Sequence, residues 1–120
     1  MSKKTLVLGA SDNPARYSFL ALQRLRNHGH PVVAIGIKAT KVGDVPVETA
    51  KVPFEDVDTV TLYLNPKHQE EYYDYILSLD PKRIIFNPGT ENDELVRKAK
   101  AKGIKTQEAC TLVMLSTNQY

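Results

Sequence analysis

The stretch TLVLGASDNPARYS, residues 5–18, decides the fold. Its first part, Thr5–Leu8, is a short run of β-forming apolar residues that ends at Gly9, which is the pattern of a buried strand. A polar turn with one proline and one arginine follows, and helical spacing begins near Tyr17. We interpret the stretch as the strand, turn and helix start that open a parallel α/β sheet.

The same alternation continues along the chain. Strand patterns are found at Thr5–Leu8, Val32–Ile37, Thr59–Leu64, Ile84–Phe86 and residues 104–109. Helical patterns are found at Tyr17–Asn27, at residues 66–79 and from a cap at Thr90 or Asn92 to a stop at Gly103; residues 110–117 form a short last helix or an irregular tail. Residues 38–56 predict an irregular connection, with room for a short strand or a broken helical turn.

Strands that alternate with helices predict an α/β fold of the Rossmann-like, doubly wound type. We expect a mainly parallel five-stranded sheet with helices on both faces. Ligands of such sheets bind outside the carboxyl ends of the strands, near the switch in strand order. The loops expected to form a site are therefore residues 9–18, 38–46, 65–68, 87–92 and 109–111.

Length and composition narrow the class of protein. The chain has 120 residues, which predicts one domain over residues 1–120. Sixteen basic and 14 acidic residues give a net charge of +2, a balance that does not favour nucleic acid as a partner. One cysteine excludes an intramolecular disulfide, and no apolar run is long enough for a membrane span. Without a signal-peptide pattern, we expect a cytoplasmic protein.

The first turn has the chemistry of a phosphate site. The dinucleotide fingerprint places glycines two and five positions after the first, where this chain has Ser11 and Pro14. A pyrophosphate lying flat on this turn is therefore not expected. The Ser11 hydroxyl, the N–H groups at the helix start and the Arg16 guanidinium are nevertheless suitable donors for a phosphate that approaches by another path. A plain turn with an exposed arginine is equally compatible with the pattern.

The end of the second strand adds a second basic group. An NAD-selective fold places an acid there to hold the ribose hydroxyls, whereas this chain has Lys38 and no acid until Asp44. A lysine at this place favours a ribose that has its own phosphate, as in NADP or coenzyme A. The alternative is a solvated lysine on a loop.

The other candidate groups give weaker signals. His68 could act as a general base, but the sequence shows no partner for it, and His28 and His30 flank a helix-ending glycine. Three histidines and one cysteine show no metal-ligand spacing. Cys110 lies near a helix start, where a thiol is made reactive, or it is a small buried apolar residue.

Together these pieces resemble the small stand-alone CoA-binding proteins, whose Rossmann-type domain is shared with the α-subunit of succinyl-CoA synthetase. The similar stretches are VLGASDNPARYS, HGHPVVAIGIK, LYLNPKH, IIFNPGTEN and EAC, and they extend over nearly the whole chain. The resemblance implies binding of CoA or an acyl-CoA by its phosphates and adenosine end. It implies that Gly9, Ala10, Ser11, Arg16 and Ser18 line the phosphates and that Lys38 faces the 3′-phosphate or the pyrophosphate. It further implies that Leu64, Asn65 and Pro66 border the nucleotide, and that Asn87, Pro88 and Gly89 border the pantetheine.

The chain departs from these relatives at three places. Lys38-Ala39 stands where relatives often have Asn-Pro, Thr111 stands where they often have proline, and the tail differs. The ligase relatives use a second domain with a phosphorylated histidine, which is not expected in 120 residues, so synthetase activity is not implied. We expect a CoA-binding module with no evident catalysis of its own. The alternatives are an NADP-dependent oxidoreductase and a nucleotide-responsive protein-interaction domain, and a homo-oligomer or an unidentified protein partner is compatible with either.

Overall fold

The computed structural model describes residues 2–120. Within these residues one seven-stranded sheet has the order β3-β4-β2-β1-β5-β6-β7, in which every neighbouring pair is parallel except β3 and β4. The strands are β1 (Thr5–Ala10), β2 (Val32–Gly36), β3 (Thr40–Val42), β4 (Val45–Glu48), β5 (Thr59–Leu62), β6 (Arg83–Phe86) and β7 (Lys105–Glu108). The strand order reverses at β1, which lies between β2 and β5.

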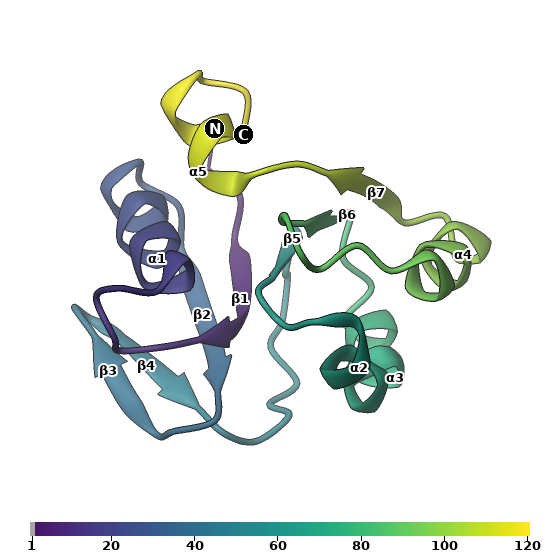
Figure 1. The fold of residues 1–120 in the computed structure, drawn as a ribbon, viewed down its shortest axis with the longest axis horizontal. Coiled ribbons are helices and arrows are strands. Elements are labelled where there is room, and N and C mark those ends of the chain that lie inside the picture. Colours follow the sequence, from purple (N-terminus) through teal and green to yellow (C-terminus); the bar gives the residue numbers. More distant parts are fainter. Residues whose placement is uncertain (1) are drawn as a thin grey trace.

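Helices cover both faces of the sheet, as Figure 1 shows. They are α1 (Tyr17–Asn27), α2 (Pro66–Gln69), the 3₁₀ turn η1 (Glu70–Tyr72), α3 (Tyr73–Ser78), α4 (Asp93–Ala101) and α5 (Thr111–Ser116). One core cluster joins α1 and α5 to Val7, and the other joins α3 and α4 to Leu6 and Leu8. Alternate residues of β1 thus serve opposite faces, as the pleat of a strand requires. The predicted α/β class with helices on both faces is confirmed.

The predicted count of five strands is too low. The five predicted strands are present, but residues 38–56 also contain the antiparallel hairpin of β3 and β4. Val42, Val45 and Val47 of this hairpin are buried against the cluster that contains α1. The hairpin also hydrogen-bonds the sheet through the parallel pairing of β4 with β2.

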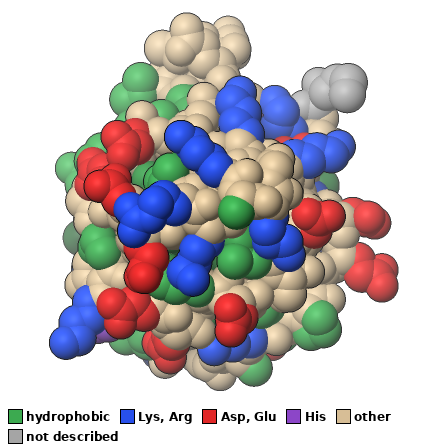
Figure 2. Space-filling view, turned by 90° about the vertical axis from the view of Figure 1, so that its right-hand side faces the viewer, with side chains coloured by type: hydrophobic (Ala, Val, Ile, Leu, Met, Phe, Trp, Pro, Cys, Tyr) green, Lys and Arg blue, Asp and Glu red, His purple; other side chains and the backbone are tan. Residues whose placement is uncertain are grey.

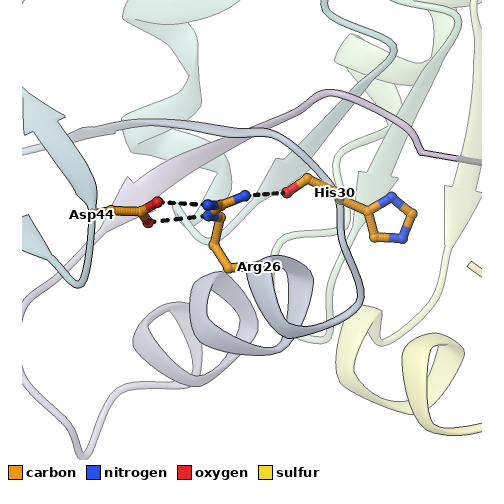
Figure 3. Close-up of polar contacts among 3 residues, drawn as sticks. All are labelled: Arg26, His30 and Asp44. Atoms are coloured by element: carbon orange, nitrogen blue, oxygen red, sulfur yellow. Dashed lines mark hydrogen bonds and ion pairs between the residues drawn. The ribbon is translucent and has the colours of Figure 1, made fainter.

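An ion pair fastens the turn of this hairpin to α1. Arg26 donates from Nε to Asp44 Oδ1 over 3.1 Å and from Nη2 to Asp44 Oδ2 over 2.5 Å, as Figure 3 shows. Nη1 of Arg26 also donates to the backbone oxygen of His30 over 3.4 Å. Hydrogen bonding to the Arg26 guanidinium lowers the pKa of Asp44. The hairpin that follows the Lys38 loop is therefore held at both its sheet edge and its turn.

The helix expected over residues 66–79 is interrupted. The chain forms α2, the 3₁₀ turn η1 and α3 in succession. A short 3₁₀ turn leaves apolar side chains at nearly the same spacing, so the sequence pattern does not reveal it. Tyr75 is buried in the core of the segment, while Tyr72 and Tyr73 are half-buried at its rim.

Other helix signals of the sequence are confirmed. Gly29 and Gly103 follow the C-caps of α1 and α4 with positive φ values of 82° and 76°. The side chain of Asn92 caps α4, and Thr90 does not. Arg16 is the N-cap residue of α1, and it makes no side-chain capping bond.

The surface shows the mixed charge that the composition predicts. Figure 2 shows basic and acidic side chains interspersed over the face that lies at the right of Figure 1, where α4 is found. Within residues 2–120, no helix has both the length and the apolar character needed to cross a bilayer.

Candidate ligand-binding cleft

A cleft of about 890 Å³ opens at the carboxyl ends of the central strands. The loops that follow β1, β2, β5 and β6 all contribute residues to its lining. This is the place where the strand order reverses, and it is the usual ligand position in open parallel sheets. The volume falls in the range of about 300–1,000 Å³ that is typical of small-molecule sites.

The turn after β1 forms one wall of the cleft. Gly9 has a φ of 97°, and the turn is stabilised by hydrogen bonds from Asn13 N to Ser11 Oγ and from Ala15 N to Asn13 Oδ1, both of 3.0 Å. Arg16 is exposed at the N-cap of α1 and lines the cleft. The first N–H groups of a helix have no intrahelical acceptor, so this end of α1 offers donors together with the guanidinium.

A second wall is formed where β2 ends. Lys38 lines the cleft and donates from Nζ to Asp12 Oδ2 over 3.2 Å, and Thr40 Oγ1 donates to the same oxygen over 2.9 Å. The hydrogen bond from Thr40, followed by that from Lys38, lowers the pKa of Asp12. The carboxylate is therefore ionised at neutral pH and joins the first turn to the Lys38 loop.

Gly36 allows these two walls to meet. A Cβ on Gly36 would stand 2.3 Å from the backbone oxygen of Ala10, closer than any side chain tolerates. The register of β1 against β2 also shifts between Leu8 and Ala10, so that Ala10 pairs with Gly36. A glycine inside a strand is the sequence signal of such a close approach, and Gly36 is a site residue that the sequence analysis missed.

The loops after β5 and β6 form the opposite side. Leu64, Asn65, Pro88, Gly89 and Thr90 line the cleft there. The Asn65 side chain caps α2 by accepting a hydrogen bond from His68 N over 2.9 Å. Asn65, Pro88 and Gly89 are exposed on this side of the cleft, Leu64 is half-buried and Thr90 is buried.

Gln69 joins these two loops by hydrogen bonds. It is fully buried, and its Nε2 donates to the backbone oxygens of Leu64 and Thr90, each over 2.8 Å. Its Oε1 accepts from Asn92 Nδ2 over 2.9 Å, and Asn92 Nδ2 also donates to the Tyr73 hydroxyl. One buried amide therefore sets the separation of two cleft loops.

Asn87 does not line the cleft, and its side chain is hydrogen-bonded within the protein. It is buried, and its Nδ2 donates to Thr61 Oγ1 over 2.7 Å and to the backbone oxygen of Leu62 over 2.9 Å. Its Oδ1 accepts from Thr111 N over 2.9 Å, at the start of α5. The side chain joins β5, β6 and α5, and the contact of Asn87 with pantetheine that the resemblance implies stays a prediction.

Tyr63 and Cys110 lie near this junction. Tyr63 lines the cleft, but its hydroxyl is buried and has no hydrogen-bond partner within residues 2–120. Burial raises the pKa of Tyr63. Cys110 is the half-buried N-cap of α5 and is not part of the cleft lining. In the part of the chain that the structure describes, no group of three His, Cys, Asp or Glu residues could hold a metal ion.

The family follows from comparison with known domains. The model of the CoA binding domain matches residues 3–116. The chain belongs to the CoA-binding domain family. A crystal structure of a protein described as uncharacterised is 48% identical, has a TM-score of 0.97, and covers 100% of this chain and 99% of its own. Among proteins of curated function, no match was found.

Two more distant structures share the fold of this CoA-binding domain. A hypothetical protein from Pyrococcus horikoshii OT3 is 24% identical, with a TM-score of 0.86 over 97% of this chain and 83% of that one. The structure of cell-free ID.343 from Thermus thermophilus is 18% identical, with a TM-score of 0.86 over 99% and 91% of the two chains. At these identities the likeness concerns the fold.

The cleft of this CoA-binding domain gathers most of the residues that the sequence singles out. It is lined by Gly9, Ala10, Ser11, Arg16, Ser18, Lys38, Leu64, Asn65, Pro88 and Gly89, but not by Pro66 or Asn87. That these residues contact a ligand stays a prediction. The cleft is also lined by residues for which the sequence pattern indicated no cleft role: Asp12, Ala15, Tyr17, Ile35, Gly36, Ile37, Thr40, Tyr63, Tyr72 and Thr90.

His68 has no catalytic partner in this arrangement. It is exposed at the cleft, and no hydrogen bond joins its imidazole to an acid or a nucleophile within residues 2–120. His28 is exposed, whereas His30 is buried on the opposite end of the sheet. The cleft lining provides hydrogen-bond donors suited to phosphate groups and apolar surface suited to a nucleobase or an alkyl chain.

Proposed function

We propose that this protein binds coenzyme A or an acyl-CoA in the cleft at the carboxyl ends of β1, β2, β5 and β6. Membership of the CoA-binding domain family supports a CoA-binding role. The cleft supports the finer statement, since its volume of about 890 Å³ and its position at the reversal of strand order suit a nucleotide ligand.

One observation supports this proposal most strongly. Arg16, at the start of α1, and Lys38, at the end of β2, line the same cleft although they come from different loops. Coenzyme A has a pyrophosphate and a 3′-phosphate, so two cationic groups and a helix start match its charge. The exposed side chains of Tyr17 and Ile37, at 72% and 98% exposure, add apolar surface at the rim for the adenine end.

The proposed role is binding without a catalytic step. The apolar and backbone surface at Leu64, Pro88 and Gly89 is suited to the pantetheine arm. The proposal assigns no proton transfer to His68, whose imidazole has no acid or nucleophile bonded to it in the described residues.

Thermal unfolding with a panel of nucleotides tests the proposal. CoA, acetyl-CoA, NADP, NAD and ATP are compared at equal concentration, and a ligand at 100 times its Kd adds about 2.7 kcal/mol of stability. We expect a raised Tm with the CoA species only. A shift with NADP alone would replace the proposal by the oxidoreductase, and no shift with any CoA species would refute it.

A double variant locates the site. Arg16→Ala with Lys38→Ala should weaken CoA binding by about 1.5–3 kcal/mol for each lost charged contact. The matched control is Arg24→Ala with Lys41→Ala, which removes the same charge from exposed positions outside the cleft lining. Unchanged CoA affinity in the first variant, or equal losses in both, would contradict the proposed site.

A further inference from the structure

The cleft contains an acid among the groups suited to phosphate. Asp12 is the sole carboxylate in the cleft lining formed by residues 2–120. It lies in the turn after β1, and its Oδ2 accepts hydrogen bonds from both Lys38 Nζ and Thr40 Oγ1. The lysine that a ligand phosphate would use is thus already neutralised by a carboxylate of the same chain.

The two partners hold Asp12 unequally. Thr40 is the first residue of β3, which pairs with β4 through Thr40 and Val47, so the backbone of Thr40 is held by the sheet. Its hydrogen bond to Asp12 is 2.9 Å long, while Lys38 Nζ lies 3.2 Å away. The Lys38 side chain is 70% exposed and that of Asp12 is 36% exposed. Lys38 is therefore the partner that can turn to a ligand, whereas Asp12 remains on Thr40.

The turn itself keeps the carboxylate in place. Hydrogen bonds from Asn13 N to Ser11 Oγ and from Ala15 N to Asn13 Oδ1 fix the backbone on the C-terminal side of Asp12. On the other side, Gly36 allows the end of β2 to come into backbone contact with Ala10 at the end of β1. A phosphate that binds Lys38 therefore lies close to the Asp12 carboxylate, and like charges at short range repel.

We propose that Asp12 is a specificity-determining residue of the cleft, which competes with the ligand's ribose phosphate for Lys38. This inference rests on the proposed binding of CoA. Asp12 lowers the gain from a phosphate on the ribose but does not repel a ribose with bare hydroxyls, because a carboxylate accepts hydrogen bonds from hydroxyls. The cleft thereby discriminates less between CoA and 3′-dephospho-CoA than its lysine alone would.

The test compares the Kd values of CoA and 3′-dephospho-CoA by calorimetry for the wild type and Asp12→Asn. Asparagine keeps the shape and an acceptor for Thr40 but has no charge. Exposed ion pairs contribute about 0.2–1 kcal/mol, so we expect the preference for CoA over 3′-dephospho-CoA to rise about 1.4- to fivefold. The rise should vanish in the Lys38→Ala background.

A control variant distinguishes an effect of Asp12 from a general effect of removing one negative charge. Asp44→Asn makes the same change of charge and breaks an ion pair in the neighbouring hairpin, outside the cleft lining. It should leave the ratio of the two Kd values unchanged. Thermal unfolding of each variant shows that it is folded at the temperature of the titration.

The outcomes separate this inference from the function on which it rests. If neither ligand binds the wild type, the proposed function fails. If both bind and Asp12→Asn leaves their Kd ratio unchanged, Asp12 is not a specificity residue. If Asp12→Asn selectively weakens CoA, Asp12 positions Lys38 for the phosphate and the proposed competition is refuted.

Discussion

Gly9 lies directly against the backbone of Tyr63: a Cβ built on Gly9 would stand 2.9 Å from both the carbonyl carbon and the carbonyl oxygen of Tyr63. Tyr63 N also donates to Leu8 O over 2.8 Å. The carboxyl end of β1 therefore lies against the start of the loop after β5, and the positions of these two cleft walls are linked.

Gly9→Ala should destabilise the protein more than Gly89→Ala. Both glycines have positive φ, 97° and 90°, so both variants incur backbone strain of about 1–3 kcal/mol. Only Gly9 would also overlap a backbone, because nothing lies within 4 Å of a Cβ on Gly89, and overpacking adds about 1–3 kcal/mol. Urea unfolding of both variants measures the difference. Equal losses would show that the contact with Tyr63 is not tight.

The elements that the sequence predicts well are those buried on both faces. Every residue of β5 (TVTL) and β6 (RIIF) is buried, and both stretches consist largely of β-branched and apolar residues, so the sequence pattern indicated both strands. The hairpin of β3 and β4 lies at a sheet edge and contains Pro46, which is a signal against a strand, so the pattern of Val42, Val45 and Val47 was not recognised.

The same reasoning applies to the cleft. Arg16 and Lys38 could be predicted because the carboxyl ends of parallel strands share one edge. The contact between Asp12 and Lys38 could not, because it spans 26 residues of sequence and depends on Thr40 at the start of an unrecognised strand. Contacts made by Gln69 with two loops depend likewise on a tertiary arrangement that no local pattern shows.

Asn87→Ala should lower stability strongly and affect ligand binding little. The change leaves Thr111 N and the backbone oxygen of Leu62 without their buried partner, at about 1–3 kcal/mol for each group. Asn27→Ala is the control, since Asn27 is exposed and its side chain makes no hydrogen bond within residues 2–120. Urea midpoints compare the two variants.

The ligand measurement distinguishes the two roles considered for Asn87. In conditions where Asn87→Ala is fully folded, its Kd for CoA should change less than that of Lys38→Ala, because Asn87 does not line the cleft. A larger change in Asn87→Ala than in Lys38→Ala would instead indicate the direct contact near the pantetheine that the sequence resemblance implies.

Gln69→Glu should loosen the two loops that Gln69 joins. The substitution replaces the Nε2 donor by a carboxylate oxygen facing the carbonyls of Leu64 and Thr90, and an unsatisfied buried group costs about 1–3 kcal/mol. Hydrogen exchange should accelerate at residues 64–69 and 88–92. Gln23→Glu, at an exposed position of α1, is the control. Exchange that rises evenly over the chain, or not at all, would contradict a local tie.

His30 should make the protein sensitive to mild acid. Its Nδ1 accepts a hydrogen bond from Lys3 N over 2.9 Å, so the buried ring is neutral. Burial, followed by the nearby charge of Lys3, lowers the pKa of His30. The unfolded chain takes up this proton near pH 6.5 and the folded chain only at lower pH. Stability is therefore complete above about pH 6.5 and falls as the pH drops from there toward the lowered native pKa.

Substitution by asparagine isolates this effect. In His30→Asn an amide oxygen replaces Nδ1 as acceptor for Lys3 N, and nothing at this position titrates. We compare urea unfolding at pH 7.5 and pH 5.5 for the wild type, His30→Asn and His28→Asn, whose ring is exposed. The wild type and His28→Asn should lose stability between these two pH values, and His30→Asn should lose less. An equal loss in all three proteins would show that the acid sensitivity arises elsewhere in the molecule.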